Sequence, residues 1–381
     1  MSRKAVDLSL AAVYRMTDLE AIDFLVQARW GSWKAVRCPH CGTINAHYWK
    51  ARERRWKCAA CGRSFSVTSE TVFAHRKLPP QKLIANTLLW INSAAGQPAL
   101  ELKRHSDTSY NTVFVLQHKL REALIRGYNE GLLSGDVEMD GAHQSGRYAD
   151  VKRGRPQGSR GFTEETPVEV LNELLASDPG RDKKKPSAYP KDRRFFITVR
   201  QRSGHRGQGA VATRVAIGRA EDAVVAESVM GAYLAVPETT LNTDASPAYQ
   251  VLGKSFRGHR TVEHGAMLVG PAGENNNQAE ELNWRMDRAE QGIYLNIEPK
   301  YMMDYGCEAA FRADTRRLPN GRQLLVALNV AMTVGTSLYW TGYTHGRHRK
   351  VELLHPGPRP APASGPAKGR HPVKGSGRPP R

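Results

Sequence analysis

The chain has 381 residues, of which 56 are Lys or Arg and 37 are Asp or Glu, so its formal net charge is +19. This length is enough for two or three domains with buried cores, and 40% apolar residues exclude a wholly disordered chain. The longest uncharged stretch, 324–343, is broken by polar residues and falls short of the ~18 consecutive apolar residues of a membrane span. The positive charge favours a polyanionic partner, and on charge alone both nucleic acid and an acidic membrane surface qualify.

Three short segments precede the main body of the sequence. Residues 1–36 show the spacing of apolar side chains that is typical of helices, and residues 37–72 are strand-like and contain two Cys-x-x-Cys pairs. Residues 78–130 are again helical, and their last two helices, 99–104 and 110–126, flank a short polar turn. These two helices form either a helix-turn-helix whose second helix enters a major groove or an ordinary helical hairpin.

The four cysteines of the second segment predict a zinc ribbon. Cys38, Cys41, Cys58 and Cys61 form the pattern C-x2-C-x16-C-x2-C, which lies within the spacing range of structural Zn²⁺ sites. Paired cysteines of this kind indicate metal binding in a reducing cytosol rather than disulfides. Arginines and lysines surround the pairs, with Trp49 and Trp56 between them. This combination suits phosphate contact and base stacking, and a solvated basic face is the alternative.

From about residue 134 the hydrophobic period changes from that of helices to that of strands. The expected strands are 136–140, 194–200, 211–218 and 238–242, and the expected helices are 220–234, 273–288, 300–317 and 324–340. This order predicts an α/β fold in which helices flank a mixed sheet. Two basic segments, about 145–189 and 346–381, are rich in polar, Gly or Pro residues and are expected to be disordered.

Acidic residues close two of the expected strands. Asp140 and Asp244 each end a strand, and carboxylates at the ends of adjacent strands converge, as a site for two divalent cations requires. A third carboxylate can come from the following helix, where Glu280 and Glu281 stand 36 and 37 residues beyond Asp244. From the residues alone, ordinary strand-end acids remain the alternative.

The order of these parts resembles that of bacterial insertion-sequence transposases of the DDE class that carry an N-terminal zinc ribbon. The resemblance extends over residues 8–317. It is carried by Arg29-Trp30, the two Cys-x-x-Cys pairs, Val137–Asp140, Thr243-Asp244, Asn277–Glu280, Tyr294, Tyr305 and Phe311-Arg312.

The resemblance implies an RNase H-like catalytic domain over 134–345 in which Asp140, Asp244 and Glu280 bind two Mg²⁺ or Mn²⁺ ions. It also implies nicking of the element's ends and transfer of the freed 3′-OH into target DNA. The implied partners are the terminal repeats, target DNA and at least one further copy of the chain, with no membrane. The implied location is the bacterial nucleoid in the cytoplasm. A catalytically inactive zinc-ribbon and helix-turn-helix DNA-binding regulator is the alternative.

The helix motif departs from the family pattern and leaves the third metal ligand open. The spacing to the downstream Tyr and Arg residues favours Glu280, the position of Trp284 favours Glu281, and some relatives use the residue that corresponds to Asn277. The resemblance further implies substrate contacts by His264, which matches a family histidine, and by Arg288, which lies beside the position of a DNA-contacting basic residue.

Overall fold

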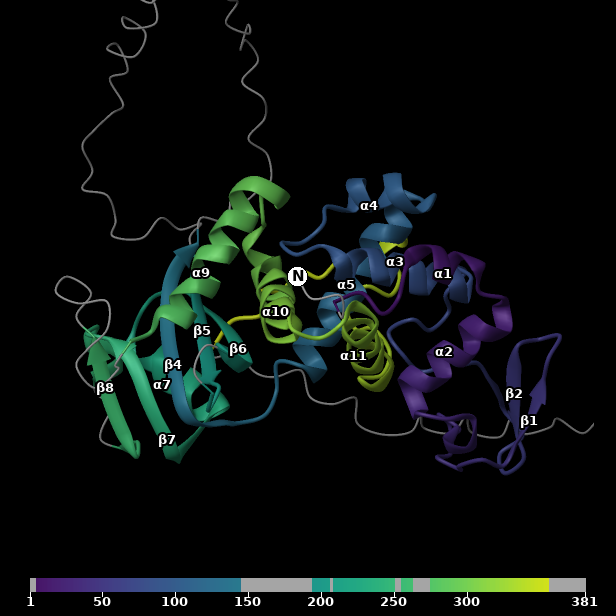
Figure 1. Ribbon diagram of the computed structural model, residues 1–381, viewed down its shortest axis with the longest axis horizontal. Coiled ribbons are helices and arrows are strands. Elements are labelled where there is room, and N and C mark those ends of the chain that lie inside the picture. The colour runs from purple at the N-terminus through teal and green to yellow at the C-terminus, as the bar shows by residue number, and fades with distance from the viewer. Residues whose placement is uncertain (1–4, 145–193, 206–207, 251–254, 263–274, 356–381) are drawn as a thin grey trace, which may run out of the picture.

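The computed structural model describes residues 5–144, 194–205, 208–250, 255–262 and 275–355. Figure 1 shows a β-sheet at one end, a small β-hairpin structure at the other, and a helical body between them. The expected insertion at 145–189 lies outside the described residues, and so does His264. No helix within the described ranges is both long and apolar enough to span a bilayer.

The chain starts with two helices that lead into the zinc-ribbon segment. Helix α1 spans Leu10–Arg15 and α2 spans Asp18–Trp30. Helix α2 begins at a capping box in which the Thr17 hydroxyl accepts from Glu20 N and the Glu20 carboxylate accepts from Thr17 N. Three antiparallel strands follow: β1 (His47–Lys50), β2 (Arg55–Cys58) and β3 (Ser64–Phe65).

The ribbon's tryptophans form its core instead of an exposed stacking surface. Trp56 is 3% exposed, and its ring lies 4.6 Å from that of Trp49 and 5.7 Å from that of Trp30 on α2. The suggestion that Trp56 stacks on bases is therefore wrong. Its large apolar surface instead fixes the ribbon on α2.

The helical body combines elements from both halves of the sequence. It contains α3 (Pro80–Asn92), α4 (Ala99–Ser106), α5 (Tyr110–Gly127), α10 (Met302–Thr315) and α11 (Asn320–Thr333). One hydrophobic cluster runs from Trp56 of the ribbon through Leu88 and Leu328 to Phe196 of the sheet. The N-terminal helices thus share a core with the last two helices.

Helices α4 and α5 are connected by the short turn expected of a helix-turn-helix. Residues 107–109 join them, and the Ser109 hydroxyl caps α5 by accepting from Thr112 N. From Val113 to Leu124, however, most side chains of α5 are buried, and α5 packs against α10 and α11. Only its first turn, 110–112, is exposed throughout.

A five-stranded mixed sheet forms the other end of the molecule. Its strands, in spatial order, are β6 (Ala210–Gly218), β5 (Arg194–Arg202), β4 (Leu133–Gln144), β7 (Leu234–Asp244) and β8 (Gly258–Val262). Strands β4, β5 and β6 are antiparallel, whereas β7 and β8 run parallel to β4. Helix α7 (Ala223–Tyr233) packs on one face, and α9 (Asn277–Ala289) and α10 pack on the other (Figure 1). The expected mixed sheet flanked by helices is confirmed.

Short helical elements complete the described chain. They are α8 (Pro247–Gln250), the 3-10 turns Trp33–Ala35, Pro299–Tyr301 and Tyr343–His345, and a π-helical turn, Glu290–Tyr294, that continues α9.

Several elements differ from those expected. Strand β7 runs over Leu234–Asp244 instead of 238–242. Strand β4 continues to Gln144 because residues 137–144 all pair with β5, so Asp140 lies inside the strand and does not close it. Strand β8 was not predicted, since Gly258–Val262 contains one apolar residue and lies at the sheet edge. The last helix begins after Pro319 and ends at Thr333, before Gly335 adopts a φ of +85°, instead of covering 324–340.

The tail expected to be disordered from residue 346 contacts the folded chain at several of its first ten residues, and 356–381 lie outside the described residues. Arg349 is 5% exposed and forms an ion pair with Asp304 of α10. Glu352 pairs with Arg194 at 2.7 Å, and His355 N donates to Ile217 O at 2.7 Å. These contacts join 346–355 to α10, β5 and β6.

Candidate functional site

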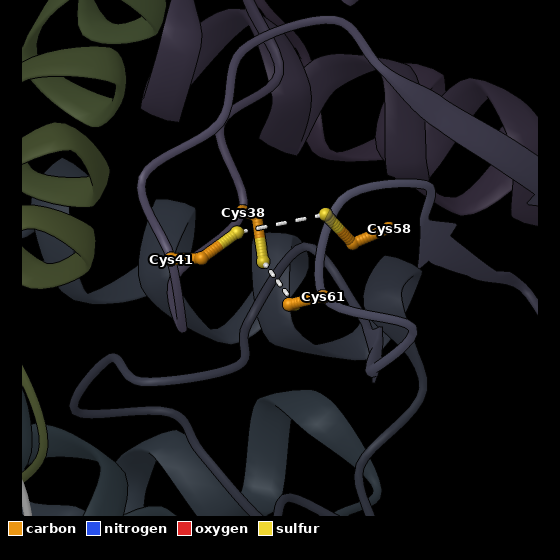
Figure 2. A group of neighbouring side chains, drawn as sticks. All are labelled: Cys38, Cys41, Cys58 and Cys61. Carbon is orange, nitrogen blue, oxygen red and sulfur yellow. Dashed lines mark hydrogen bonds between the residues drawn. The ribbon is translucent and has the colours of Figure 1, made fainter.

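The four predicted zinc ligands lie together at the end of the ribbon (Figure 2). Their Sγ atoms are all within 4.8 Å of one another, with 3.7 Å between Cys38 and Cys61 and 3.6 Å between Cys41 and Cys58. Four sulfurs at about 2.3 Å from one Zn²⁺ would stand about 3.8 Å apart, whereas a disulfide requires about 2.05 Å. The cluster therefore fits a closed tetrahedral zinc site.

Two equivalent turns aim the cysteine pairs at one point. Gly42 N donates to Cys38 O at 2.9 Å, and Gly62 N donates to Cys58 O at 3.0 Å. Both glycines have positive φ, +79° and +70°, a conformation that a residue with a Cβ adopts at a cost. Each glycine thus lets the chain turn back directly after its cysteine pair.

The second candidate site lies on the face of the sheet that α9 covers. The β4–β7 pairing sets Val137 opposite Leu241 and Glu138 opposite Asn242, and continuing this register by two residues brings Asp140 level with Asp244. Adjacent strands stand about 4.8 Å apart. The two aspartates therefore occupy neighbouring positions on one face.

Helix α9 is fixed on this face by a carboxylate of the sheet. Glu138 is fully buried, and its Oε2 accepts from Gln278 N at 2.7 Å and Ala279 N at 3.1 Å. Its Oε1 accepts from Arg202 Nε at 2.6 Å. A carboxylate at a helix N-terminus satisfies free N–H groups and complements the helix dipole, so Glu138 fixes where α9 begins over β4.

Two asparagines of this helical segment hold the Asp140 carboxylate. Asn283 Nδ2 donates to Asp140 Oδ2 at 2.6 Å, and Asn276 Nδ2 donates to Asp140 Oδ1 at 3.1 Å. The Asn283 Oδ1 accepts from the Thr198 hydroxyl on β5 at 2.6 Å, which sets the orientation of the amide. These residues were not identified from the sequence. Their separation of seven residues, two helical turns, is the signal that places both on one helix face.

The three options for the third ligand differ in their surroundings. Glu280 is half-buried and lies four residues after Asn276 and three before Asn283, hence on the helix face that meets Asp140. Glu281 forms an ion pair with Arg200 of β5, with 3.3 Å between Glu281 Oε2 and Arg200 Nη1. Partial burial opposes ionisation of Glu281, but Arg285 and Arg200 lower its pKa. Asn277 is exposed at the first turn of the helix.

A buried tyrosine lies close to both aspartates. Tyr249 of α8 is 1% exposed. Burial raises the pKa of its hydroxyl, and the charges of Glu221, Asp244 and Asp140 raise it further. Asp244 itself accepts from Ser246 N at 3.0 Å, which fixes the turn between β7 and α8.

The carboxylates form a more open group than the cysteines do. In the described part of the chain, the four cysteines are the one group of three or more acidic, His or Cys residues whose ligand atoms all lie within 4.8 Å of each other. A two-metal site does not require such compactness, because its ions stand about 4 Å apart. Arg288 is exposed and its guanidinium lies 5.4 Å from the Trp284 ring centre.

Comparison with known proteins identifies the domains that hold these two sites. Residues 132–314 match the ISXO2-like transposase domain, and residues 16–64 match the transposase zinc-ribbon domain. The chain therefore belongs to the insertion-sequence transposases of the DDE class with an N-terminal zinc ribbon, as the sequence resemblance predicted.

One relative of the chain is a protein of a transposable element. Over 152 residues the chain is 28% identical to "Uncharacterized protein in transposable element ISH50" of Halobacterium salinarum. The match covers 39% of this chain and 49% of the relative, so it spans about half of the relative's length. No solved structure shows a significant match to the chain.

Proposed function

We propose that this chain is an active transposase that binds the ends of its insertion sequence, nicks them with Mg²⁺ or Mn²⁺, and joins the freed 3′-OH to target DNA. The observation that supports the proposal is the parallel β4–β7 pairing, whose register, continued by two residues, brings Asp140 level with Asp244 beneath the helix that carries Glu280. This arrangement lies within the segment that matches a transposase domain.

The donor set suits the metals of the proposed reaction. Carboxylate oxygens are the preferred ligands of Mg²⁺, and Asp140, Asp244 and Glu280 offer three carboxylates at one end of the sheet. When bound, two such ions activate an attacking oxygen and stabilise the charge on the leaving 3′ oxygen. Glu281 and Asn277 are the weaker options, because Glu281 pairs with Arg200 and Asn277 is exposed.

The neighbouring residues would act by positioning these ligands. Asn283 and Asn276 restrict the Asp140 carboxylate through both of its oxygens. Glu138 fixes the start of α9 and hence the location of Glu280. Holding reacting groups in place before the substrate arrives is a large part of the catalytic effect in phosphoryl transfer.

The remaining elements of the proposal concern DNA and assembly. The zinc-ribbon and transposase domains imply DNA binding, and we propose the element's terminal repeats and target DNA as substrates. His264 and Arg288 are proposed substrate contacts. Because two ends must be brought together, we expect at least a dimer, acting at the nucleoid in the cytoplasm.

Cleavage of a labelled duplex that carries the flanking element end tests the proposal. Wild type should leave a 3′-OH nick with Mg²⁺ or Mn²⁺, while Asp140→Asn and Asp244→Asn should bind the duplex without nicking it. Asp136→Asn is the matched control, since this carboxylate lies on the same strand but is exposed and 3.9 Å from Arg260. Binding without cleavage by wild type in either metal would instead favour the inactive regulator.

A second series of variants tests which residue is the third metal ligand. Glu280→Gln should abolish nicking, whereas Glu281→Gln and Asn277→Ala should retain it. If Glu280→Gln still nicks the duplex and Glu281→Gln or Asn277→Ala does not, the inactive variant identifies the third ligand.

A further inference from the structure

A hollow of about 540 Å³ lies between the zinc ribbon and the segment that leads into α3, away from the carboxylate site. It is lined by Arg54 and Arg55 of the β1–β2 hairpin and by residues of the segment 66–80. His40, in the first cysteine turn, also lines it. The hollow therefore opens directly beside the predicted zinc site.

The lining of the hollow is rich in cations and hydroxyl groups. These are Arg54, Arg55, Arg76 and Lys77, together with Ser64, Ser66, Thr68 and Ser69. A phosphate group accepts hydrogen bonds from both kinds of donor, and charge-assisted bonds of this type are about twice as strong as neutral ones.

Two of the four cations have structural contacts. Arg54 forms an ion pair with Asp18 of α2. Arg76 Nε donates to the Thr68 hydroxyl at 3.2 Å, and its guanidinium also reaches Leu78 O. Burial lowers the pKa of Arg76, and the nearby charge of Arg54 lowers it further. The Arg54 and Arg76 guanidinium groups repel each other, the charge of Asp18 offsets part of this repulsion, and an anion in the hollow would offset it further.

The other two cations have no ion-pair partner within the described part of the chain. Arg55 and Lys77 are both exposed at the rim. The lining also holds Glu53 and Glu70, but Glu53 pairs with Lys50 at 3.1 Å, and the charge of Glu70 acts on the buried Arg29. Arg55 and Lys77 are thus the cations best placed to meet a ligand.

The backbone around the hollow is unusually strained. Of the six non-glycine residues with positive φ in the described chain, three line this hollow: Arg54 at +52°, Glu70 at +54° and His75 at +59°. Side chains with a Cβ adopt this conformation at a cost, and such residues concentrate at binding sites. Half of these left-handed non-glycine residues of the described chain therefore lie around one hollow.

We propose that this hollow binds a backbone phosphate of duplex DNA, with Arg55 and Lys77 as the direct contacts and the serine hydroxyls of 66 and 69 as additional donors. The inference rests on the proposed function, since it assumes that the chain binds DNA. Phosphate contacts fix the register of a protein on the duplex and carry no base information. The site would therefore contribute to binding of any duplex sequence.

Fluorescence anisotropy with two labelled duplexes, one carrying the element end and one of unrelated sequence, tests this site. The double variant Arg55→Gln/Lys77→Gln should bind both duplexes at least about tenfold more weakly. The slope of log K against log salt concentration should fall by about 1.8, as expected for two lost phosphate contacts. The control Arg52→Gln/Arg63→Gln removes the same charge from exposed ribbon residues outside the hollow and should cause less than half of these changes.

Chemical acetylation of the wild-type protein, followed by mass spectrometry, measures how accessible each lysine is with and without DNA. Duplex DNA should protect Lys77 several-fold and leave the exposed Lys350 reactive. Equal losses in the two double variants, or an unprotected Lys77, would overturn the phosphate site while leaving DNA binding intact. Failure of wild type to bind either duplex would overturn the proposed function and this site with it. Zinc content and melting temperature establish that the variants are folded.

Discussion

Replacing Glu308 by glutamine should destabilise the protein far more than an ordinary surface substitution. Glu308 of α10 is 2% exposed. Its Oε2 accepts from Arg121 Nε of α5 at 2.6 Å, and its Oε1 accepts from Arg312 Nη2 at 2.6 Å. Arg312 also donates to Trp90 O at the end of α3 at 2.7 Å. One carboxylate thus links three helices of the body.

The buried charges set the expected loss in the free energy of unfolding. Removing one partner of a buried ion pair leaves an uncompensated charge and costs about 3–5 kcal/mol. Burial opposes the charge of Glu308, yet Arg121 and Arg312 lower its pKa from 4.5 to about 2, which corresponds to about 3 kcal/mol. For a chain of 381 residues such a loss lowers the melting temperature by about 4–6 °C.

The pH dependence of this loss has a definite sign. Because the pKa is lower in the folded state, the contribution of Glu308 is complete above pH 4.5 and disappears as the pH falls toward 2. The difference between wild type and Glu308→Gln should therefore be full at pH 7 and smaller at pH 3. Circular dichroism during heating measures both values.

A surface ion pair on the same side of the molecule provides the control. Glu298 pairs with Lys300 at 2.6 Å, but both side chains are about one-third exposed, and such pairs contribute about 0–1 kcal/mol. Glu298→Gln should shift the melting temperature by no more than about 1 °C. Equal shifts for the two variants, or a Glu308→Gln shift below 2 °C, would refute the assignment of this stability to the buried charges.

Three further predictions concern other parts of the molecule. Burial lowers the pKa of His118 to about 4, so the unfolded chain binds a proton between pH 6.5 and 4 that the folded chain does not. His118→Phe should reduce the fall in melting temperature over that window by the equivalent of up to about 3 kcal/mol, and an unchanged pH profile would contradict it. Asn283→Ala removes the 2.6 Å hydrogen bond to Asp140 and should weaken Mn²⁺ binding about tenfold or more by calorimetry, whereas the exposed Asn277→Ala should not. Cys41→Ser should lower the zinc content from one ion per chain toward zero, and equal zinc in variant and wild type would count against the four-thiolate site.

The sequence predicts best those features that depend on local spacing. The cysteine pairs predict the zinc ribbon because four ligands and two glycine turns lie within one short segment. Strand and helix periodicity predicts the sheet flanked by helices. Neither requires knowledge of what lies next to a residue in space.

Features that depend on partners far away in the sequence could not be predicted from local spacing. Asp140 is expected to close a strand, but β5, which follows fifty residues later in the chain, extends β4 to Gln144. Arg121 and Glu308 have the composition of a solvated helix face, yet they are buried because they pair with each other across 187 positions. Edge strand β8 lacks the apolar alternation that would identify it, since parallel pairing with β7 supplies its order.

Residues near the end of the described chain form contacts that hold the N-terminal segment in place. Asn320 Nδ2 donates to Leu8 O at 2.8 Å, and Asn329 Nδ2 donates to Ala28 O at 2.8 Å. During synthesis, α2 emerges long before α11, one of the helices on which it packs. An N-terminal fragment that ends before α11 would lack that surface and leave apolar side chains of α2 exposed to solvent.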